Sequence, residues 1–520
     1  MSTSFSDPDV DRAVVVDALE AAGFELEEQE ALTRTAIDTF DGHLHAAGLR
    51  LELRRSSSTE LVLSGPGADD PDAHVAVADA PGVAADLPRG PLRERLVKVT
   101  EGERLLPLLT ITSVPTVAVR RDRLGKTTVA VVIHDELTFD ETPAGTPTGP
   151  ASELPGWAAE VRPVAGHPDA SDRAVHVLAS TGLGRSEGDV VSLAARCAGV
   201  DLETRSSSPT VPLDPGEPAH DGFRRTLLNL ARTVDRNRAG TALDLDPEFL
   251  HELRVAVRRT RSVVAQGRRV LPDDVRDRYK EAFRWLGTQT GPARDLDVYV
   301  IEWERYVEPL APRSVAALED VLAQIELRRQ AAHAELATTL RSDAYRELME
   351  GWERWLEHPA AMTETGERAL GPVVAKRIAK AQRRLLEDGR AITEESEPER
   401  LHDLRKDAKK LRYLIECFGG LFESGPRKKF VRRLKDLQDN LGEHQDAEVH
   451  IEQLAELAHD LHEQRSVGVD ALLAMGQLTE SLERRRAGAR AEFAERFAHY
   501  DTAKTQRALD DLLESVRDPS

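Results

Sequence analysis

Cationic side chains and a histidine occur twice in this chain at the same spacing. The first copy runs from His251 to Arg261, and the second runs from His402 to Arg412, 151 residues later. The cations of the two copies are Arg254, Arg258, Arg259 and Arg261 in the first and Arg405, Lys409, Lys410 and Arg412 in the second. Guanidinium groups offer planar sets of donors to phosphoryl oxygens, and ammonium groups offer a mobile charge. The repeat therefore predicts a surface that binds an anion.

Each copy fits one helix. At about 100° per residue, the histidine and three cations of each copy fall in a stripe about 80° wide. Leu253, Val257 and Val264 lie on the opposite side in the first copy, and Leu404 and Ile415 do so in the second. We therefore predict two amphipathic helices, each with a core side and a cationic side.

The cationic sides need a counter-charge, because like charges three or four residues apart on a helix repel. Carboxylates within residues 294–297 and 443–446 follow the two helices at matching positions, and we expect them to pair with part of the charge. They are too few, since residues 400–435 hold 12 Lys and Arg against 4 Asp and Glu in a chain of net charge −21. A solvated helix face would explain one charged stripe, but two stripes in register favour a bound anion.

At these residues the chain resembles the CHAD domain family. The stretches from His251 to Pro272 and from Leu401 to Phe422, each followed by a Leu-Gly or Leu-Gln-Asp segment and an Asp, are similar to the two halves of such a domain. The resemblance covers roughly residues 221–515. It implies two helical bundles related by a pseudo-two-fold axis, with basic residues lining a central cavity that binds inorganic polyphosphate. It also implies an association with polyphosphate granules.

Further cations stand at matching positions on the first helix of each half, predicted over residues 223–238 and 374–387. Arg225 matches Lys376, and Arg232 matches Arg383. The complete predicted polyphosphate-binding set is His251, Arg254, Arg258, Arg259, Arg261, His402, Arg405, Lys409, Lys410, Arg412, Arg225, Arg232, Lys376, Arg383, Lys406 and Arg433.

The N-terminal part has a different pattern. A helix is predicted over residues 10–23, and residues 25–160 contain short alternating runs at 51–54, 61–64, 116–120 and 128–133, typical of antiparallel strands. One segment resembles the second and third strands of the CYTH family, through Asp38-Thr39-Phe40-Asp41, Leu44, Gly48, Leu51 and Arg54. The resemblance implies a tunnel of antiparallel strands, whose active members hydrolyse or cyclise triphosphates with a divalent metal.

Because the sequence departs from the CYTH pattern at several positions, we do not expect it to have the activity of that family. The chain starts on a helix and has no Glu-x-Glu-x-Lys strand before Asp38, and Glu52 stands where the family has a second arginine. The family residues that match are Arg54, Arg120, Arg121 and Glu160, which could equally be ordinary salt-bridge partners. Metal-assisted phosphoryl chemistry needs several converging carboxylates. We therefore expect no triphosphatase activity, no catalytic residue, no cofactor and no bound metal.

These patterns predict an α+β chain of two domains. An antiparallel CYTH-like β domain covers residues 1–205, a linker rich in Pro and Ser covers 206–220, and an all-α domain covers 221–515 with halves at 221–365 and 366–515. No apolar run reaches the length of a membrane span, and the N-terminus lacks the pattern of a secretory signal, so we expect a cytoplasmic protein. Cys197 and Cys417 stand alone, which argues against disulfides.

The function predicted from the sequence is the binding of inorganic polyphosphate. One alternative is a metal-dependent triphosphatase or polyphosphatase, in which the helical domain feeds substrate to the β domain. A nucleic-acid binder is disfavoured by the acidic total charge and by the lack of aromatic residues among the basic runs. A scaffold that docks an acidic tail and a homo-oligomer both stay open. Two histidines in the basic surface predict tighter binding at pH 6 than at pH 8.

Overall fold

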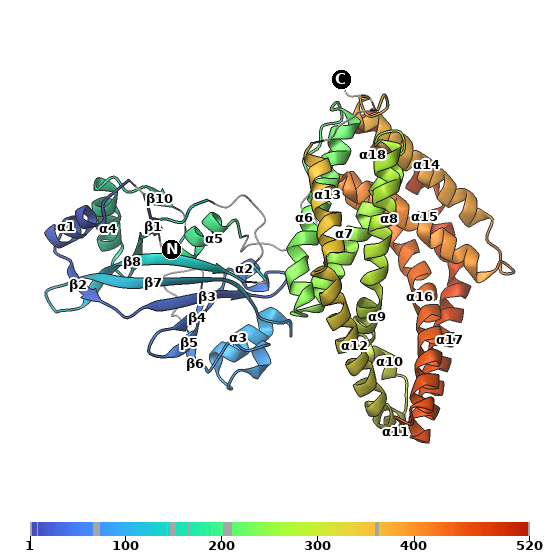
Figure 1. Cartoon of the computed structure of the whole chain (residues 1–520), viewed down its shortest axis with the longest axis horizontal. Helices are drawn as coiled ribbons and strands as arrows, with labels where there is room; N and C mark the ends of the chain where they lie inside the picture. The colour runs from blue at the N-terminus through green and yellow to red at the C-terminus, as the bar shows by residue number, and fades with distance from the viewer. Residues whose placement is uncertain are drawn as a thin grey trace. The chain divides into compact units, whose positions relative to one another are not determined.

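The computed structural model describes residues 3–7, 9–65, 73–142, 144–145, 152–164, 166–186, 188–200, 211–358 and 363–517 (Figure 1). The chain divides into two compact units. One holds Met1–Ser207 with Ala239–Phe249, and the other holds Ser208–Arg238 with Leu250–Ser520. We call them the β-domain and the helical domain. Of the predicted linker, residues 206–210 lie outside the described part of the chain. No helix in that described part is long and apolar enough to cross a membrane.

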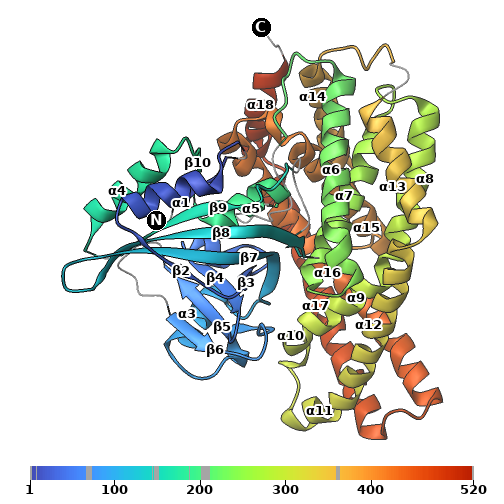
Figure 2. The same ribbon diagram turned by 60° about the vertical axis from the view of Figure 1, so that its left-hand side comes forward.

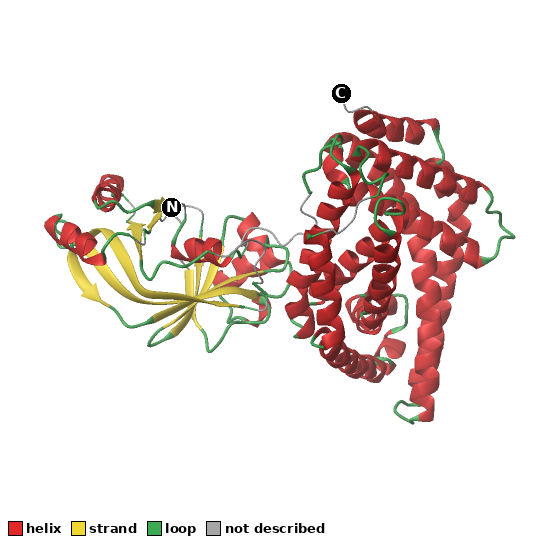
Figure 3. Cartoon of the chain, turned by 45° about the horizontal axis from the view of Figure 1, so that its top comes forward, coloured by secondary structure: helices red, strands yellow, loops and turns green. Residues whose placement is uncertain are grey.

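The β-domain is built on one antiparallel sheet, which Figure 3 shows in yellow. Its strands are β1 (Thr3–Phe5), β2 (Glu25–Glu28), β3 (Leu32–Asp38), β4 (Arg50–Arg55), β5 (Thr59–Ser64), β6 (Ala73–Ala76), β7 (Leu106–Arg121), β8 (Thr127–Glu141), β9 (Ala158–Pro163) and β10 (Arg185–Ser186). They are ordered β10-β1-β9-β8-β7-β3-β4-β5-β6, and β2 pairs with β7. All four predicted runs lie in these strands, so the predicted antiparallel fold is confirmed.

Short helices cover the sheet with apolar faces. Helices α1 (Arg12–Ala21) and α4 (Pro168–Ser180) pack on β8 and β9, while α2 (His43–Ala46) and α3 (Pro91–Thr100) pack on β4 and β5. Helix α5 (Val190–Ala198) packs on β7. The expectation that the chain starts on a helix was wrong, because β1 precedes α1 and pairs with β9. Three residues with one buried aromatic side chain are too short to show a strand period.

The helical domain repeats its elements as it repeats its sequence. Helix α6 (Ala219–Ala242) begins 151 residues before α14 (Leu370–Arg390), and α7 (Pro247–Gln266) both begins and ends 151 residues before α15 (Pro398–Cys417). Helices α8 (Asp273–Gln289) and α9 (Gly291–Ile301) together match residues 424–452 of one continuous helix, α16 (Ser424–Glu463). The first copy breaks where Pro292 lacks an amide hydrogen, and the second has Glu443 there.

The two halves of the helical domain share a core. Helix α12 (Glu319–Leu340) of the first half packs with α16 and with α17 (Val469–Tyr500) of the second, as Figure 2 also shows. The remaining helices are α10 (Trp303–Val307), α11 (Pro312–Ala317), α13 (Asp343–Glu357) and α18 (Ala503–Arg517). On α13, Trp352 is fully buried against Phe283 and stacks on Trp355, so it belongs to the core of the helical domain.

Candidate functional site

The repeated helices α7 and α15 bring their cationic sides together. Lys409 on α15 is half-buried, and its pKa falls to about 8 because of burial and of the nearby charges of Arg405, Arg258 and Arg412. One of these neighbours, Arg258, comes from the other half of the domain. The cationic sides of the two predicted helices therefore face each other in the fold.

Several residues of the first half interact with their own counterparts in the second, by charge or by a hydrogen bond. A residue can neighbour its own counterpart only near the axis that relates the two copies. These pairs, each 151 positions apart, are Arg258 with Lys409, Asp295 with Asp446, and Tyr299 with His450. The cationic sides therefore meet at the pseudo-two-fold axis of the helical domain.

Contacts around the axis also repeat. The Nδ1 atom of His251 lies 2.9 Å from a guanidinium nitrogen of Arg294, and Nδ1 of His402 bonds to the side-chain oxygen of Gln445. Each partner stands 43 positions after its histidine. Because a guanidinium only donates, Nδ1 of His251 accepts, and its proton in the neutral ring is on Nε2. We call the group formed by His251, Arg254, Arg258, Arg261, His402, Arg405, Lys409 and Arg412 the basic cluster.

The arginines of the basic cluster are held by helices α8, α9 and α16. Arg254 donates to the hydroxyl of Thr290 at 3.1 Å, and Arg405 donates to Asp446 at 2.7 Å. A Cβ on Gly291 would lie 3.6 Å from Arg254, and a Cβ on the matching Gly442 would lie 3.8 Å from Arg405. The two guanidinium groups thus occupy equivalent places.

Burial and like charge change the titration of this group. The pKa of His251 falls to about 4 because of burial and then of Arg294, Arg258 and Arg254. Burial also lowers the pKa of Arg254 to about 10, although Asp295 opposes the shift. His251 is therefore neutral from pH 6 to pH 8. The expectation that this histidine adds charge over that range was wrong, because the surrounding cations disfavour its charged form.

Carboxylates neutralise part of the basic cluster. Glu416 accepts from Arg259 at 2.8 Å and from Arg412 at 2.5 Å, so one carboxylate ties α7 to α15. As predicted, Asp295 and Asp446 lie near the cluster. Asp297 does not, since it accepts from Arg329 and His333 instead.

Three buried donors of the basic cluster lack an acceptor. Within the described residues, the Nε atoms of Arg254, Arg258 and Arg405 are buried and have no hydrogen-bond partner. Leaving a buried donor unsatisfied costs about 1–3 kcal/mol. An anion among these side chains would supply the missing acceptors and offset the repulsion between the cations.

Other residues of the predicted set lie elsewhere. Arg225 bonds to Glu217 and to the Pro212 carbonyl before α6, and the charge of Arg232 acts on Glu353 of α13. Lys406 is exposed and pairs with Asp403 at 3.0 Å. The charge of Lys410 acts on Asp407, Lys376 and Arg383 are exposed on α14, and Arg433 is half-buried on α16.

The sequence interpretation missed Arg294 and Glu416. Arg294 could have been found from its spacing, since it follows His251 as Gln445 follows His402. The different chemistry of those two residues hid the match. Glu416 stands one helical turn after Arg412, which predicts the pair within α15 but not the bond to Arg259 from the other half.

The interior of the β-domain holds a second charged group. Arg34 is buried and contacts three buried carboxylates: Glu52 at 2.7 Å, Asp189 at 3.2 Å and Glu160 at 3.4 Å. Burial acts to raise the pKa of Glu52, but Arg34 and Arg54 outweigh it and lower that pKa to about 2. Glu52 is therefore ionised, and all three carboxylates pair with the β-domain's own arginines.

This interior does not fit the divalent metal that the CYTH resemblance implies. Such an ion needs carboxylate oxygens that are free to converge on it, and here Arg34 occupies the centre of the carboxylates. Of the family matches, Arg54 and Glu160 belong to this network. Arg121 lies outside it and pairs with the exposed Glu25 and Glu27. Arg120 stands opposite Val129 on the β7–β8 ladder.

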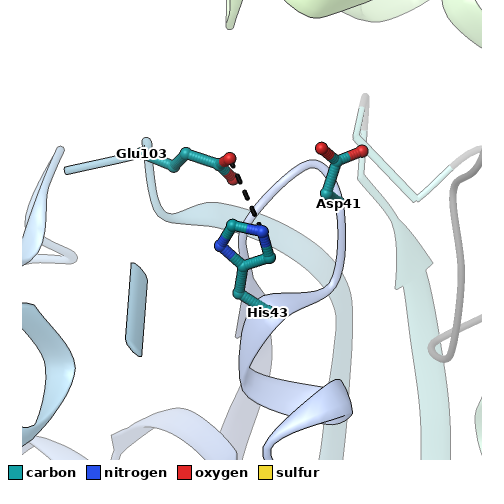
Figure 4. A group of neighbouring side chains, drawn as sticks. All are labelled: Asp41, His43 and Glu103. Atoms are coloured by element: carbon teal, nitrogen blue, oxygen red, sulfur yellow. Dashed lines mark ion pairs between the residues drawn. The ribbon is translucent and has the colours of Figure 1, made fainter. Parts of the chain in front are cut away.

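One group of side chains in the β-domain consists of residue types that bind metal ions. The ligand atoms of Asp41, His43 and Glu103 lie within 4.8 Å of one another, and Nε2 of His43 is 3.7 Å from Glu103 (Figure 4). Asp38 fixes the loop by accepting from the amide of Leu44 at 2.8 Å. A histidine and two carboxylates are ligands that zinc or manganese accepts. Exposed carboxylates often come this close without an ion, so the arrangement by itself assigns none.

Comparison with known proteins places these features in a family. The sequence profile of the CHAD domain matches residues 225–455. An uncharacterized protein of Mycobacterium tuberculosis is 26% identical over 254 residues, which are 48% of this chain and 47% of that protein. The chain thus spans about half the length of the curated relatives it matches.

Two solved structures are similar to this chain. The CHAD domain from the plant Ricinus communis is 25% identical, with 59% of this chain and 96% of that chain covered and a TM-score of 0.45. PptA from Streptomyces chartreusis is 17% identical, with 54% and 100% covered and a TM-score of 0.43. The profile match spans α7, α15 and the basic cluster between them. This chain therefore contains a CHAD domain, formed by the repeated helices of its C-terminal part.

Proposed function

We propose that this protein binds inorganic polyphosphate at the basic cluster. The observation that carries the proposal is a group of cations from both halves whose buried donors on Arg254, Arg258 and Arg405 lack acceptors. A chain of phosphates would supply an acceptor to each of them. It would also relieve the repulsion that, together with burial, lowers the pKa of Lys409 and of His251.

Inorganic polyphosphate fits this cluster better than a nucleic acid does. The residues of the basic cluster are arginines, lysine and histidines, without the aromatic side chains on which bases stack. The total charge of −21 opposes general attraction to nucleic acid, so that binding depends on local contacts. Polyphosphate bound here releases counterions, and its affinity should fall steeply with salt.

The paired interior of the β-domain supports a binding role over an enzymatic one. The carboxylates that could hold a catalytic metal are bonded to Arg34, and their release would leave that arginine buried without a partner. We therefore propose that the β-domain carries out no triphosphate chemistry. A protein of this kind would collect at polyphosphate granules, which a fluorescent fusion in cells tests.

The direct test is a titration of the full chain with long-chain polyphosphate. The cluster variant is Arg254→Ala, Arg258→Ala, Arg405→Ala. Its control is the α8 variant Arg278→Ala, Lys280→Ala, Arg284→Ala, which removes three exposed cations of the same domain. We expect the cluster variant to lose at least about a hundredfold in affinity, since charged hydrogen bonds contribute about 1.5–3 kcal/mol each, and the α8 variant to bind as the wild type does.

Two outcomes would refute the proposal. Equal affinity of the wild type and the cluster variant would show that polyphosphate binds elsewhere or without specificity. Release of phosphate with magnesium or manganese would make the enzymatic alternative correct. Circular dichroism of each variant checks that a loss of affinity does not come from a loss of fold.

A further inference from the structure

The beginning of α16 carries an unbalanced charge. Residues 424–435 include six cations and no carboxylate. The cations are Arg427, Lys428, Lys429, Arg432, Arg433 and Lys435, and four of them, Lys428, Lys429, Arg432 and Lys435, are exposed. Among the described residues, none of these four exposed side chains makes an ion pair. Six positive charges in three turns repel one another, so the helix itself gains nothing from them.

The matching segment of the first half has no such excess. Residues 273–284 of α8 hold four cations and four carboxylates. Several of them pair with each other: Arg276 with Asp273 at 2.5 Å and with Asp277 at 3.0 Å, and Arg284 with Glu281 at 3.4 Å. The two copies build the same helix with net charges of zero and plus six. The excess on α16 is therefore not a requirement of the fold.

Three of the four exposed cations face the same way as the part of α16 that contacts the basic cluster. At about 100° per residue, Lys428, Arg432 and Lys435 fall within about 80° of one another and of Gly442 and Asp446. Asp446 is the partner of an arginine of the basic cluster, and Gly442 lies beside the same arginine. One side of α16 thus holds both the edge of the cluster and the exposed cations.

The cations of α16 begin where those of α15 end. The last cation of the α15 stripe, Arg412, lies 3.4 Å from the side-chain oxygen of Gln438. Lys435 stands one turn before Gln438 on α16, and Arg432 and Lys428 follow in the same direction. From Gly442 to Lys428 the helix rises about 21 Å. The next carboxylates, Asp436 and Asp439, are the only acidic residues of α16 between Ser424 and Gly442.

We propose that Lys428, Arg432 and Lys435 form a track that continues the basic cluster outward along α16 and binds further phosphates of the same polyphosphate chain. The proposal rests on polyphosphate binding at the basic cluster. Because α8 lacks an equivalent track, a long chain leaves the cluster over the second half of the domain. The track adds affinity only for chains longer than the cluster itself accommodates, so it makes binding depend on chain length.

The test compares tripolyphosphate with long-chain polyphosphate on three full-length proteins. These are the wild type, the track variant Lys428→Ala, Arg432→Ala, Lys435→Ala, and the α8 variant Arg278→Ala, Lys280→Ala, Arg284→Ala. Both variants remove three exposed cations and the same charge, so general attraction changes equally. We expect the track variant to lose about tenfold or more in affinity for the long chain, at about a fewfold per exposed contact, and to keep its affinity for tripolyphosphate. The α8 variant should keep both.

Salt dependence gives a second readout. The slope of log affinity against log salt concentration should fall by about two to three for the track variant with the long chain, since each lost phosphate contact removes roughly 0.7–0.9. Equal losses in the track and α8 variants would overturn the proposal. An equal loss for both chain lengths would place the three cations in the basic cluster instead. A wild type that binds neither chain would refute the binding function, and the track with it.

Discussion

Replacing Lys409 by methionine should stabilise the free protein. Lys409 is half-buried beside Arg258, Arg405 and Arg412, and its pKa falls from 10.5 to about 8 in the folded state. One pKa unit corresponds to about 1.4 kcal/mol. The full shift of about 2.5 units would cost about 3 kcal/mol, and partial exposure reduces this to about 2 kcal/mol. The variant should gain this amount at pH 7, where the lysine carries its charge in both states.

The same shift fixes the pH dependence. Between pH 8 and pH 10.5 the unfolded chain holds the Lys409 proton and the folded chain does not, so stability rises with pH over this window. Below pH 8 both states are charged, and the unfavourable contribution is complete. Lys409→Met should therefore be more stable than the wild type at pH 7, and the difference should shrink as pH rises towards 10.

Urea denaturation followed by far-UV circular dichroism measures both effects. The matched control is Lys410→Met, on the same helix, because the charge of Lys410 acts favourably on Asp407 and its removal should not stabilise the protein. A Lys409→Met protein that is less stable than the wild type at pH 7 would refute the reasoning. A difference that stays constant from pH 7 to pH 10 would show that methionine packing, and not charge, is the cause.

Three further predictions follow from the contacts described above. Affinity for polyphosphate should fall as pH rises through about 8, because Lys409 loses its proton there, while His251 with a pKa of about 4 contributes no charge in this range. Calorimetric titration across that range measures the affinity, and Lys409→Met should remove most of its pH dependence. Arg34→Leu should destabilise the β-domain by about 3–5 kcal/mol, because it leaves three buried carboxylates without their cation, whereas the exposed Arg121→Leu should change its thermal unfolding little. Glu416→Gln should destabilise the helical domain by about 1–3 kcal/mol, since it breaks both ion pairs of the carboxylate that ties α7 to α15; denaturant unfolding checks it.

The repeat made much of the helical domain predictable. A constant offset and a helical period gave α7 and α15 as amphipathic helices with matching cationic sides, and the structure places Arg258 and Lys409 together. An offset states which residues are equivalent but not how far apart they lie. Only the three-dimensional structure therefore shows that the two copies of one residue face each other across the axis.

The contacts that the sequence did not predict involve partners on other helices and strands. Arg225 was predicted for the site because it matches Lys376, yet Glu217 before α6 binds it. In the β-domain, Glu52 stands where the CYTH family has an arginine, and the sequence did not show what it binds. In the fold it is the partner of Arg34. Arg34 and Glu52 stand on adjacent strands, and Glu160 reaches the same arginine from β9. Such pairs depend on strand register, which alternation within single strands does not give.

Equivalent residues of the two halves meet at the pseudo-two-fold axis, and this arrangement affects how the site can evolve. In a dimer of two identical chains, a residue on the axis meets a copy of itself, and any substitution changes both sides at once. Joining the two copies in one gene removes that constraint. Here Arg258 of the first half meets Lys409 of the second half, whose pKa falls to about 8. Likewise Tyr299 donates to the carbonyl of His450, while the ring of His450 forms its hydrogen bond with Tyr306. In the fused chain the two sides of the axis therefore carry different residues, which a symmetric dimer could not have.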